Sequence, residues 1–286
     1  MKPYTITHSL RTTNGVVYNS PHSGTYFPEH FLENIIVEKK LLESSGDTLV
    51  DQLIRQVDRH GSQIFINHYA RSYVDTNRAP NEIDPAMFTD IPPKTKFFKS
   101  EKVMRGFGVI PRRAYDGTPI YAAPLPFDCA RHRLTHIYHP IHQALSDLLQ
   151  EVKQQAGYYL LVDCHSMPSY PFIGSRLPAH TQPDVVLGNY HGKSCQHKIS
   201  AFIEKHFSEH GLTVAFNNPY AGGYNTVHYG NPHRKEYAIQ IEINRKLYID
   251  EKTLMPHDGF IRIQTMFTEL AQKLNEELPG LMSGKT

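Results

Sequence analysis

The sequence has no surplus of charge of either sign. Its 286 residues hold 30 lysines and arginines against 28 aspartates and glutamates, which gives a formal net charge of +2. Binding to nucleic acid or to an anionic membrane surface usually needs a clear basic surplus, because many phosphates must be neutralised. We therefore expect no nucleic-acid partner and no membrane partner.

Cysteines and long hydrophobic runs are also scarce. Residues 1–8 lack the apolar core of a signal peptide, and no later stretch is long and apolar enough to cross a bilayer. Cys129, Cys164 and Cys195 are too few and too scattered for a disulfide framework, and none belongs to a CxxC pair. We expect a soluble, cytoplasmic protein.

What the sequence does contain is an alternation of strand-like and helix-like segments, with 40% hydrophobic residues to build a core. Apolar or alternating runs predict strands over residues 16–20, 63–69, 71–75, 160–162, 183–188, 213–216 and 237–243. Helical spacing predicts helices over residues 37–60 with a break at Gly46-Asp47, 134–152 with a kink or late start at Pro140, 194–210, and 258–274. This alternation predicts one α/β domain, with its core at about residues 15–277, built on a mixed, mostly parallel sheet flanked by helices.

Two other segments are predicted to be loops. Residues 79–127 are rich in proline, and a structureless stretch of this length is usually functional, so we expect it to cover a site. Residues 220–224 contain the pair Gly222-Gly223, which could let this loop close over a ligand.

Two histidines follow expected central strands, at the edge where α/β folds collect their reactive groups. They are His22 and His165. Asp47, at the break in the first helical segment, is the best-placed carboxylate. A catalytic zinc site takes about three ligands of these kinds from separate strand ends. The pattern predicts a metal site at His22, Asp47 and His165, with Asp163 orienting His165. The alternative, that each histidine is a hydrogen-bonded loop residue, stays open.

Charged residues near expected strands suggest the remaining functional groups. Glu242 lies inside an apolar strand, where an unpaired carboxylate is costly to bury. It could pair with Arg245, or it could act as a general base with a pKa raised by burial. Arg71, Asn77 and Arg78 would suit an anionic substrate, because a guanidinium binds a carboxylate and polarises a carbonyl. Surface ion pairing is the alternative for these arginines.

A nucleophile beside His165 is a rival hypothesis. Strand alternation would turn Cys164 into the packing of the sheet, and Ser166 has none of the glycines of a nucleophile elbow. Neither residue therefore makes a strong nucleophile candidate.

Six short motifs occur in order between about residues 19 and 250. They are Pro21-His22-Ser23-Gly24, Gly46-Asp47, Ser72-Tyr73-Val74-Asp75-Thr76-Asn77-Arg78, Asp163-Cys164-His165-Ser166, Gly222-Gly223-Tyr224 and Gln240-Ile241-Glu242-Ile243-Asn244. This ordered set resembles the motifs of the N-formylglutamate amidohydrolase family. The resemblance implies a fold similar to the zinc-dependent exopeptidases (phosphorylase/hydrolase-like) and aspartoacylase, with one divalent metal ion, zinc or alternatively cobalt.

The resemblance also implies a reaction and residue roles. The substrate would be N-formyl-L-glutamate, a small N-acylated acidic amino acid, hydrolysed to formate and L-glutamate in histidine degradation. Glu242 would activate water and Arg71 would stabilise the oxyanion. Asn77 and Arg78 would bind the substrate carboxylate, and Tyr224 would line the substrate site.

One departure from the related peptidases concerns the second metal ligand. Those peptidases take two ligands from His-x-x-Glu, but the residue three positions after His22 is Thr25. Asp47 is our substitute and Glu29 the fallback. Two other functions stay open: a related metal-dependent deacylase of another N-acyl amino acid or small peptide, and a non-catalytic protein that binds a small carboxylate.

Overall fold

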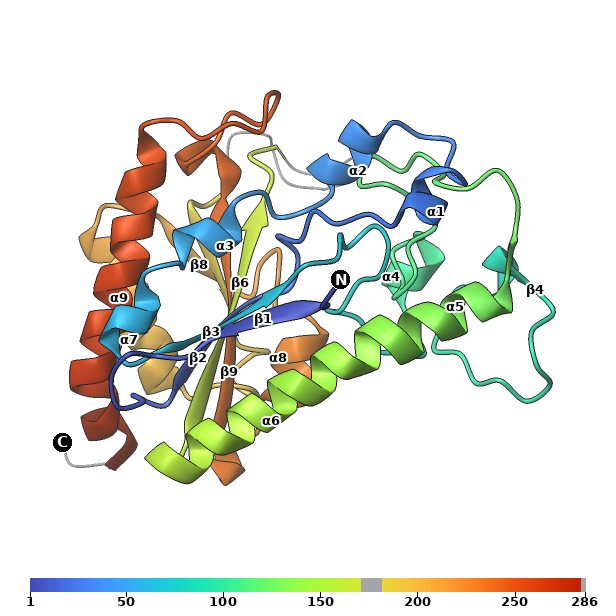
Figure 1. Cartoon of the computed structure of the whole chain (residues 1–286). Helices are drawn as coiled ribbons and strands as arrows, with labels where there is room; N and C mark the ends of the chain where they lie inside the picture. The colour runs from blue at the N-terminus through green and yellow to red at the C-terminus, as the bar shows by residue number, and fades with distance from the viewer. Residues whose placement is uncertain (171–181, 284–286) are drawn as a thin grey trace. The chain divides into compact units, whose positions relative to one another are not determined.

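A computed structural model describes residues 1–170 and 182–283 (Figure 1). The chain forms two compact units. The first comprises Met1–Tyr4, Pro21–Thr48 and Asn67–Leu145, and the second comprises Thr5–Ser20, Leu49–Ile66 and Ser146–Thr286. Our assignment of the whole chain to one catalytic domain stays a prediction.

The main sheet of the described residues has seven strands in the order β1-β3-β2-β6-β9-β7-β8. β2 pairs in parallel with β3 and β6, and β6 in parallel with β9; β7 is antiparallel to β9 and parallel to β8. The predicted mixed, mostly parallel sheet is confirmed, with β7 and β8 running opposite to β9. The strands are β1 Tyr4–Thr7, β2 Val16–Ser20, β3 Gln63–Asn67, β6 Tyr159–Met167, β7 Val185–Gly188, β8 Val214–Phe216 and β9 Glu236–Asn244.

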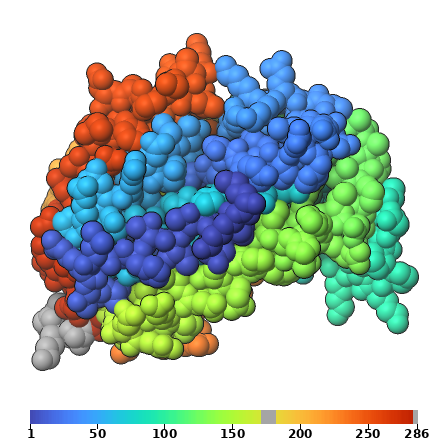
Figure 2. Space-filling view, viewed as in Figure 1, coloured from blue at the N-terminus to red at the C-terminus, as the bar shows by residue number. Residues whose placement is uncertain are grey.

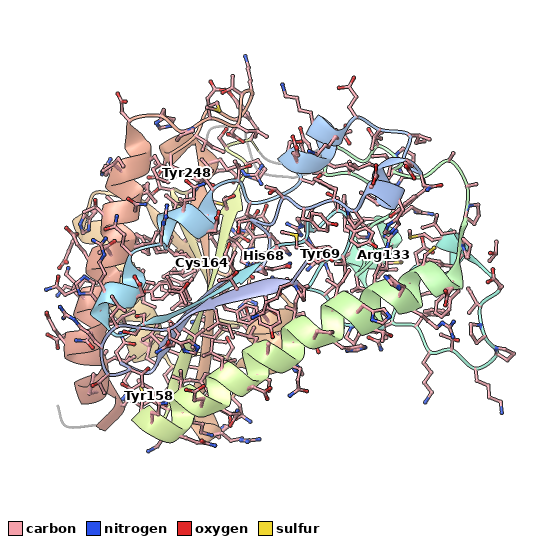
Figure 3. All side chains as sticks on the ribbon, in the orientation of Figure 1. His68, Tyr69, Arg133, Tyr158, Cys164 and Tyr248 are labelled. Carbon is pink, nitrogen blue, oxygen red and sulfur yellow. The ribbon has the colours of Figure 1, made fainter. Side chains whose placement is uncertain are left out.

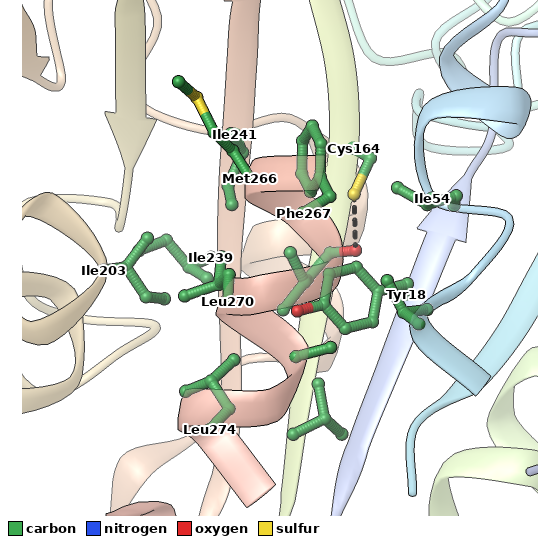
Figure 4. Close-up of a cluster of buried hydrophobic side chains, with 14 of the residues drawn as sticks. Tyr18, Ile54, Cys164, Ile203, Ile239, Ile241, Met266, Phe267, Leu270 and Leu274 are labelled. Carbon is green, nitrogen blue, oxygen red and sulfur yellow. Dashed lines mark hydrogen bonds between the residues drawn. The ribbon is translucent and has the colours of Figure 1, made fainter. Parts of the chain in front are cut away.

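Helices of the second unit bury one face of this sheet. Side chains from α3, α7 and α9 form a fully apolar cluster with every second residue of the central strands (Figure 4). Cys164, Ile239 and Ile241 point into this cluster, as strand alternation predicts. The outer side of α9 lies at the surface in Figure 2, and Ile261 there is 64% exposed. The helices of this unit are α3 Val50–Leu53, α7 His197–Glu209, α8 Tyr224–Tyr229 and α9 Gly259–Ser283, with 3₁₀ turns Val57–His60, Pro232–Arg234 and Arg245–Leu247.

The first unit is dominated by loops. Residues 79–127 are largely irregular, as predicted, and their short elements include a two-stranded pair of β4 and β5. Whether this segment covers a site stays a prediction. The elements of the unit are α1 Glu29–Leu32, α2 Lys39–Ser44, the 3₁₀ turn Pro85–Met87, β4 Phe88–Thr89, α4 Glu101–Met104, β5 Leu125–Pro126 and α5 Phe127–Arg133.

A long helical run continues from α5 through a π-helical turn, Leu134–Tyr138, into α6, His139–Ala156. The prediction placed its start at residue 134. The π turn lies directly before Pro140, and such a turn absorbs the backbone hydrogen bond that proline cannot make. The predicted kink or late start is therefore a local change of helix type.

Several boundaries differ from the predictions. Residues 71–75 form a turn instead of a strand, because the amides of Tyr73 and Val74 both bond to the carbonyl of Ala70. The last helix runs beyond residue 274 to Ser283, and β1 and α8 were not predicted. None of the helices in the described residues is long and apolar enough to cross a membrane.

His206 is a buried histidine of α7. Its Nε2 lies 2.9 Å from the Met266 carbonyl oxygen on α9. Burial lowers the pKa of His206 from 6.5 to about 4, against the opposing effect of that hydrogen bond; His210 and Lys273 lower the pKa further, and Glu269 raises it. Between pH 6.5 and about 4, the folded protein thus keeps the His206 side chain neutral, whereas the unfolded chain takes up a proton there.

The expected consequence is a loss of stability in mild acid. Because the folded pKa lies below the unfolded one, the neutral His206 contributes its full stability above pH 6.5 and loses it as the pH falls towards about 4. Urea unfolding at pH 7 and pH 5, in the presence of a chelator, measures this loss. His206→Gln should show a smaller fall in unfolding free energy between the two pH values than the parent protein. Equal falls in both proteins would contradict the assignment.

Candidate functional site

His22 lies in the loop after β2, in the first unit, and is only 2% exposed. Its Nε2 is 2.7 Å from Asp75 Oδ1, and its Nδ1 is 3.5 Å from Asp47 Oδ2. A carboxylate accepts a hydrogen bond from an imidazole N–H, so in the neutral ring Nε2 carries the hydrogen and Nδ1 keeps its lone pair. The tautomer therefore leaves Nδ1, on the side of Asp47, as the nitrogen that can bind a cation.

Asp47 reaches this position because Gly46 lets two backbone segments approach closely. The Asp47 amide donates to the His22 carbonyl oxygen at 2.9 Å. A Cβ atom at Gly46 would lie 3.1 Å from that same oxygen, closer than most side chains tolerate. The predicted break in the helical segment is confirmed: α2 ends at Ser44, α3 begins at Val50, and the glycine marks a close approach. Glu29, the fallback ligand, is exposed at the start of α1.

Asp75 is hydrogen-bonded to His22 and to two further donor groups. Its carboxylate accepts from Arg71 Nη2 at 2.8 Å and from the Asn77 amide at 2.9 Å. Burial raises the pKa of Asp75, but the charges of His22, Arg71 and Arg78 outweigh burial and hold this pKa well below its ordinary value. Asp75 is therefore a permanent carboxylate that fixes the orientation of the His22 ring. The sequence analysis did not predict this contact, because it placed Asp75 at the end of a strand.

Helical residues hold the turn that carries these groups. Arg133 Nη1 donates to the Tyr73 carbonyl at 3.0 Å, Tyr138 donates its hydroxyl to the Arg78 carbonyl at 2.7 Å, and His142 Nε2 lies 3.0 Å from the Thr76 carbonyl. The Arg133 guanidinium, labelled in Figure 3, also lies 4.1 Å from the centre of the Tyr73 ring. These supporting residues were not predicted. Tyr138 lies within the helix predicted over residues 134–152, and nothing in the helical spacing marks its hydroxyl as bonded.

Some of the predicted substrate-binding residues in this unit are hydrogen-bonded to the backbone. Arg78 donates from Nε to the Phe107 carbonyl at 3.1 Å and from Nη1 to the Asn77 carbonyl at 2.8 Å. Arg71 keeps a side chain that is 25% exposed. Their roles in substrate binding stay predictions.

His165 lies in the second unit and shows the same arrangement with a different aspartate. Its Nε2 is 3.0 Å from Asp163 Oδ2, so in the neutral ring Nε2 carries the hydrogen. Asp163 is held by Asn19 Nδ2 at 2.6 Å and Asn225 Nδ2 at 3.2 Å. The predicted contact between Asp163 and His165 is confirmed. His165 does not follow the strand, however, because β6 continues to Met167 through its pairing with β9.

That pairing brings His165 level with Glu242. The two residues are register partners in parallel strands, so their side chains leave the same face of the sheet, opposite the apolar cluster. Glu242 is 7% exposed, and its Oε1 accepts from Gln240 Nε2 at 2.8 Å. Gln240 Oε1 in turn accepts from the Gly223 amide at 2.8 Å. Glu242 is thus connected to the loop that leads into Tyr224, the first residue of α8.

Neither rival nucleophile has the surroundings of a nucleophile. Cys164 is fully buried in the apolar cluster, and burial, with the Asp163 charge adding to it, raises the pKa of the thiol well above its ordinary value. Ser166 Oγ accepts from Arg245 Nε at 3.1 Å. The suggested pairing of Arg245 with Glu242 stays a prediction.

The predicted ligands His22, Asp47 and His165 are all buried, and each offers an atom of a kind that binds a metal ion. The chemistry of the donors fits such an ion. Two ligands of one zinc ion, with bonds of about 2.0–2.2 Å, lie about 3.3–3.5 Å apart, and His22 Nδ1 and Asp47 Oδ2 are separated by 3.5 Å. Each histidine also donates its other ring N–H to a carboxylate, as metal-bound histidines do.

Comparison with known proteins places the chain among hydrolases of α/β architecture that act on an amide bond. A family model described as N-formylglutamate amidohydrolase matches residues 14–249, so the chain belongs to the N-formylglutamate amidohydrolase family. It is 28% identical over 243 residues to the N-formylglutamate deformylase of Pseudomonas aeruginosa, covering 83% of each chain. It is 26% identical over 239 residues to the deformylase of Pseudomonas putida, covering 82% of each.

Solved structures agree with this assignment. The crystal structure of N-formylglutamate amidohydrolase from Ralstonia eutropha JMP134 superposes with a TM-score of 0.90 at 32% identity, covering 96% of this chain and 98% of that one. A gene product of Agrobacterium tumefaciens superposes with a TM-score of 0.69 at 17% identity, covering 97% and 96%, which shows the fold alone.

Proposed function

We propose that this protein hydrolyses N-formyl-L-glutamate to formate and L-glutamate, the reaction after which its family and its Pseudomonas relatives are named. The observation that carries the proposal is the repeated histidine–aspartate pair. His22 with Asp75, and His165 with Asp163, each bury an imidazole whose proton is directed to a carboxylate. This arrangement prepares two nitrogen ligands, which a site that merely binds a carboxylate would not need.

We propose that His22, Asp47 and His165 hold one divalent metal ion, with zinc as the first choice and cobalt as the alternative. When bound, such an ion supplies a positive charge that polarises a carbonyl and makes water a better nucleophile at neutral pH. Imidazole nitrogens and a carboxylate suit zinc. The buried carboxylates Asp75 and Asp163 keep both imidazoles in the ligand tautomer.

The other side chains act at successive steps of the hydrolysis. Glu242 accepts a proton from the attacking water, since its buried carboxylate lies level with His165 on the neighbouring strand. As water adds to the formyl carbon, negative charge grows on the formyl oxygen, and Arg71 stabilises it. The C–N bond then breaks, and Glu242 returns the proton to the leaving amine.

Asn77 and Arg78 bind the carboxylate of the glutamyl part, and Tyr224 lines the substrate site. The hydrogen bonds from Arg78 to two backbone carbonyls support this role, because they hold the guanidinium in one orientation. We also propose a cytoplasmic location, which the three free cysteines support.

Formate release from purified protein tests the proposal. N-formyl-L-glutamate should be cleaved, cleavage should stop after chelation, and zinc or cobalt should restore it. N-acetyl-L-glutamate and a glutamyl dipeptide serve as comparison substrates and should be cleaved more slowly. Faster cleavage of either one would replace the proposed substrate by another N-acyl amino acid or a small peptide. Full activity after complete metal removal would overturn the metal assignment.

A further inference from the structure

A second cluster of potential metal ligands lies between α7 and α9, both in the second unit. His206 and His210 are four residues apart on α7 and so share one face of the helix, and Glu269 comes from α9. One ligand atom from each of the three side chains lies within 4.8 Å of the others. The two imidazole ring centres are 4.7 Å apart. The N-formylglutamate reaction uses none of these residues.

His206 presents a buried nitrogen with no hydrogen-bond partner. Its Nε2 donates to the Met266 carbonyl at 2.9 Å, so Nδ1 of the neutral ring carries the lone pair. That Nδ1 is buried and has no partner among the described residues. A buried acceptor without a donor is unfavourable in a folded protein, and a bound cation would satisfy it.

His210 also has one ring nitrogen hydrogen-bonded to a backbone carbonyl. Its Nδ1 lies 2.8 Å from the His206 carbonyl oxygen, and this contact places a hydrogen on Nδ1. Its Nε2 lies 2.8 Å from Glu269 Oε2. In a neutral ring that Nε2 would direct a lone pair at a carboxylate, which is repulsive. A cation held between the two groups would remove this repulsion.

We propose that His206 Nδ1, His210 Nε2 and the Glu269 carboxylate bind a zinc ion that links α7 to α9. Two imidazoles and one carboxylate are a typical zinc ligand set, and both histidines donate their other ring N–H to a backbone carbonyl. His210 is 27% exposed and Glu269 is 45% exposed, so both can adjust around the ion and water can complete the coordination. Lys273 is a nearby positive charge that would oppose binding of a cation, but its ammonium is paired with Glu209 at 3.1 Å.

The role of this ion would be structural. Both helices pack their apolar sides into the cluster that covers the sheet, so a link between them stabilises that packing. In the absence of zinc, the contact between His210 and Glu269 makes a weaker version of the same link.

Zinc stoichiometry and thermal stability test the proposal. The chelated protein is dialysed against zinc, and bound metal is counted alongside His210→Ala and Glu269→Gln, both of which change partly exposed side chains. His197→Ala, an exposed histidine at the start of the same helix, is the control. A fourth protein, His22→Ala/His165→Ala, lacks the proposed catalytic ligands and isolates the second site.

The expected result has three parts. The double variant binds about one zinc per chain and its melting temperature rises with zinc. His210→Ala and Glu269→Gln in that background weaken binding by about 100-fold or more, since even outer hydrogen-bond partners are worth about 10–100-fold. His197→Ala changes nothing, and the single variants at 210 and 269 keep the hydrolase activity of the parent. A double variant that binds no zinc, or binds it equally well without His210 and Glu269, would overturn the proposal.

Discussion

Glu242→Gln is expected to lower kcat for N-formyl-L-glutamate by about 10²–10⁴-fold, the range that a positioned general base contributes. An amide has nearly the same shape as the carboxylate and can still accept the hydrogen bond from Gln240 Nε2. It cannot take a proton from water. The substitution should therefore remove the chemistry while keeping the fold, which steady-state kinetics and circular dichroism can measure together.

Glu236→Gln is the matched control for this variant. Glu236 lies at the other end of the same strand, where it pairs with Lys153 at 2.9 Å and Arg234 at 3.2 Å. Its replacement should leave kcat unchanged. If Glu242→Gln kept near-normal turnover with intact fold and metal content, Glu242 would not be the base.

His22→Ala and His165→Ala are expected to abolish turnover and metal binding at the proposed catalytic site, because each removes one of its three proposed ligands. Asp75→Asn and Asp163→Asn should have an intermediate effect, weakening metal binding by about 10–100-fold. An asparagine presents a neutral amide in place of the carboxylate that fixes the tautomer of each imidazole. Chelator competition, with bound metal measured by mass spectrometry, separates the two classes.

Asp184→Asn serves as the control here. Asp184 is also an acid beside a strand, but its carboxylate bonds to Thr213 and Lys246, and hydrogen bonds from Thr213 lower its pKa despite burial. Its replacement should leave metal affinity unchanged. Equal affinity in the parent, Asp75→Asn and Asp163→Asn would show that these carboxylates do not prepare the ligands.

Local patterns in the sequence were sufficient for most of the secondary structure of the second unit. The apolar runs of β2, β7 and β9 and the helical spacing of α7 and α9 are strong signals, since each element buries one continuous face. Alternation also placed Cys164 on the packed face of β6, which excluded it as a nucleophile. Motif order led to the family that the comparisons then established.

The first unit was harder to predict because its conformation depends on distant partners. Residues 71–75 have the β-branched and aromatic composition of a strand, yet they form a turn. A helix some 60 residues later holds this turn through Arg133 and holds the residues just after it through Tyr138 and His142. Composition cannot reveal such contacts, because a turn needs its hydrogen bonds satisfied wherever the partners lie in the sequence.

The sequence by itself determined which residue types are available for chemistry: two histidines, an aspartate, a buried glutamate and a group of arginines, each within a recognisable motif. Only the tertiary structure decided which nitrogen of each histidine faces a carboxylate and which strand residue stands beside His165. Asp75 directs the proton of His22, and the register of β6 with β9 sets Glu242 level with His165. The reason is physical: tautomer and register depend on hydrogen bonds between segments far apart in the chain, and a local pattern carries no information about them.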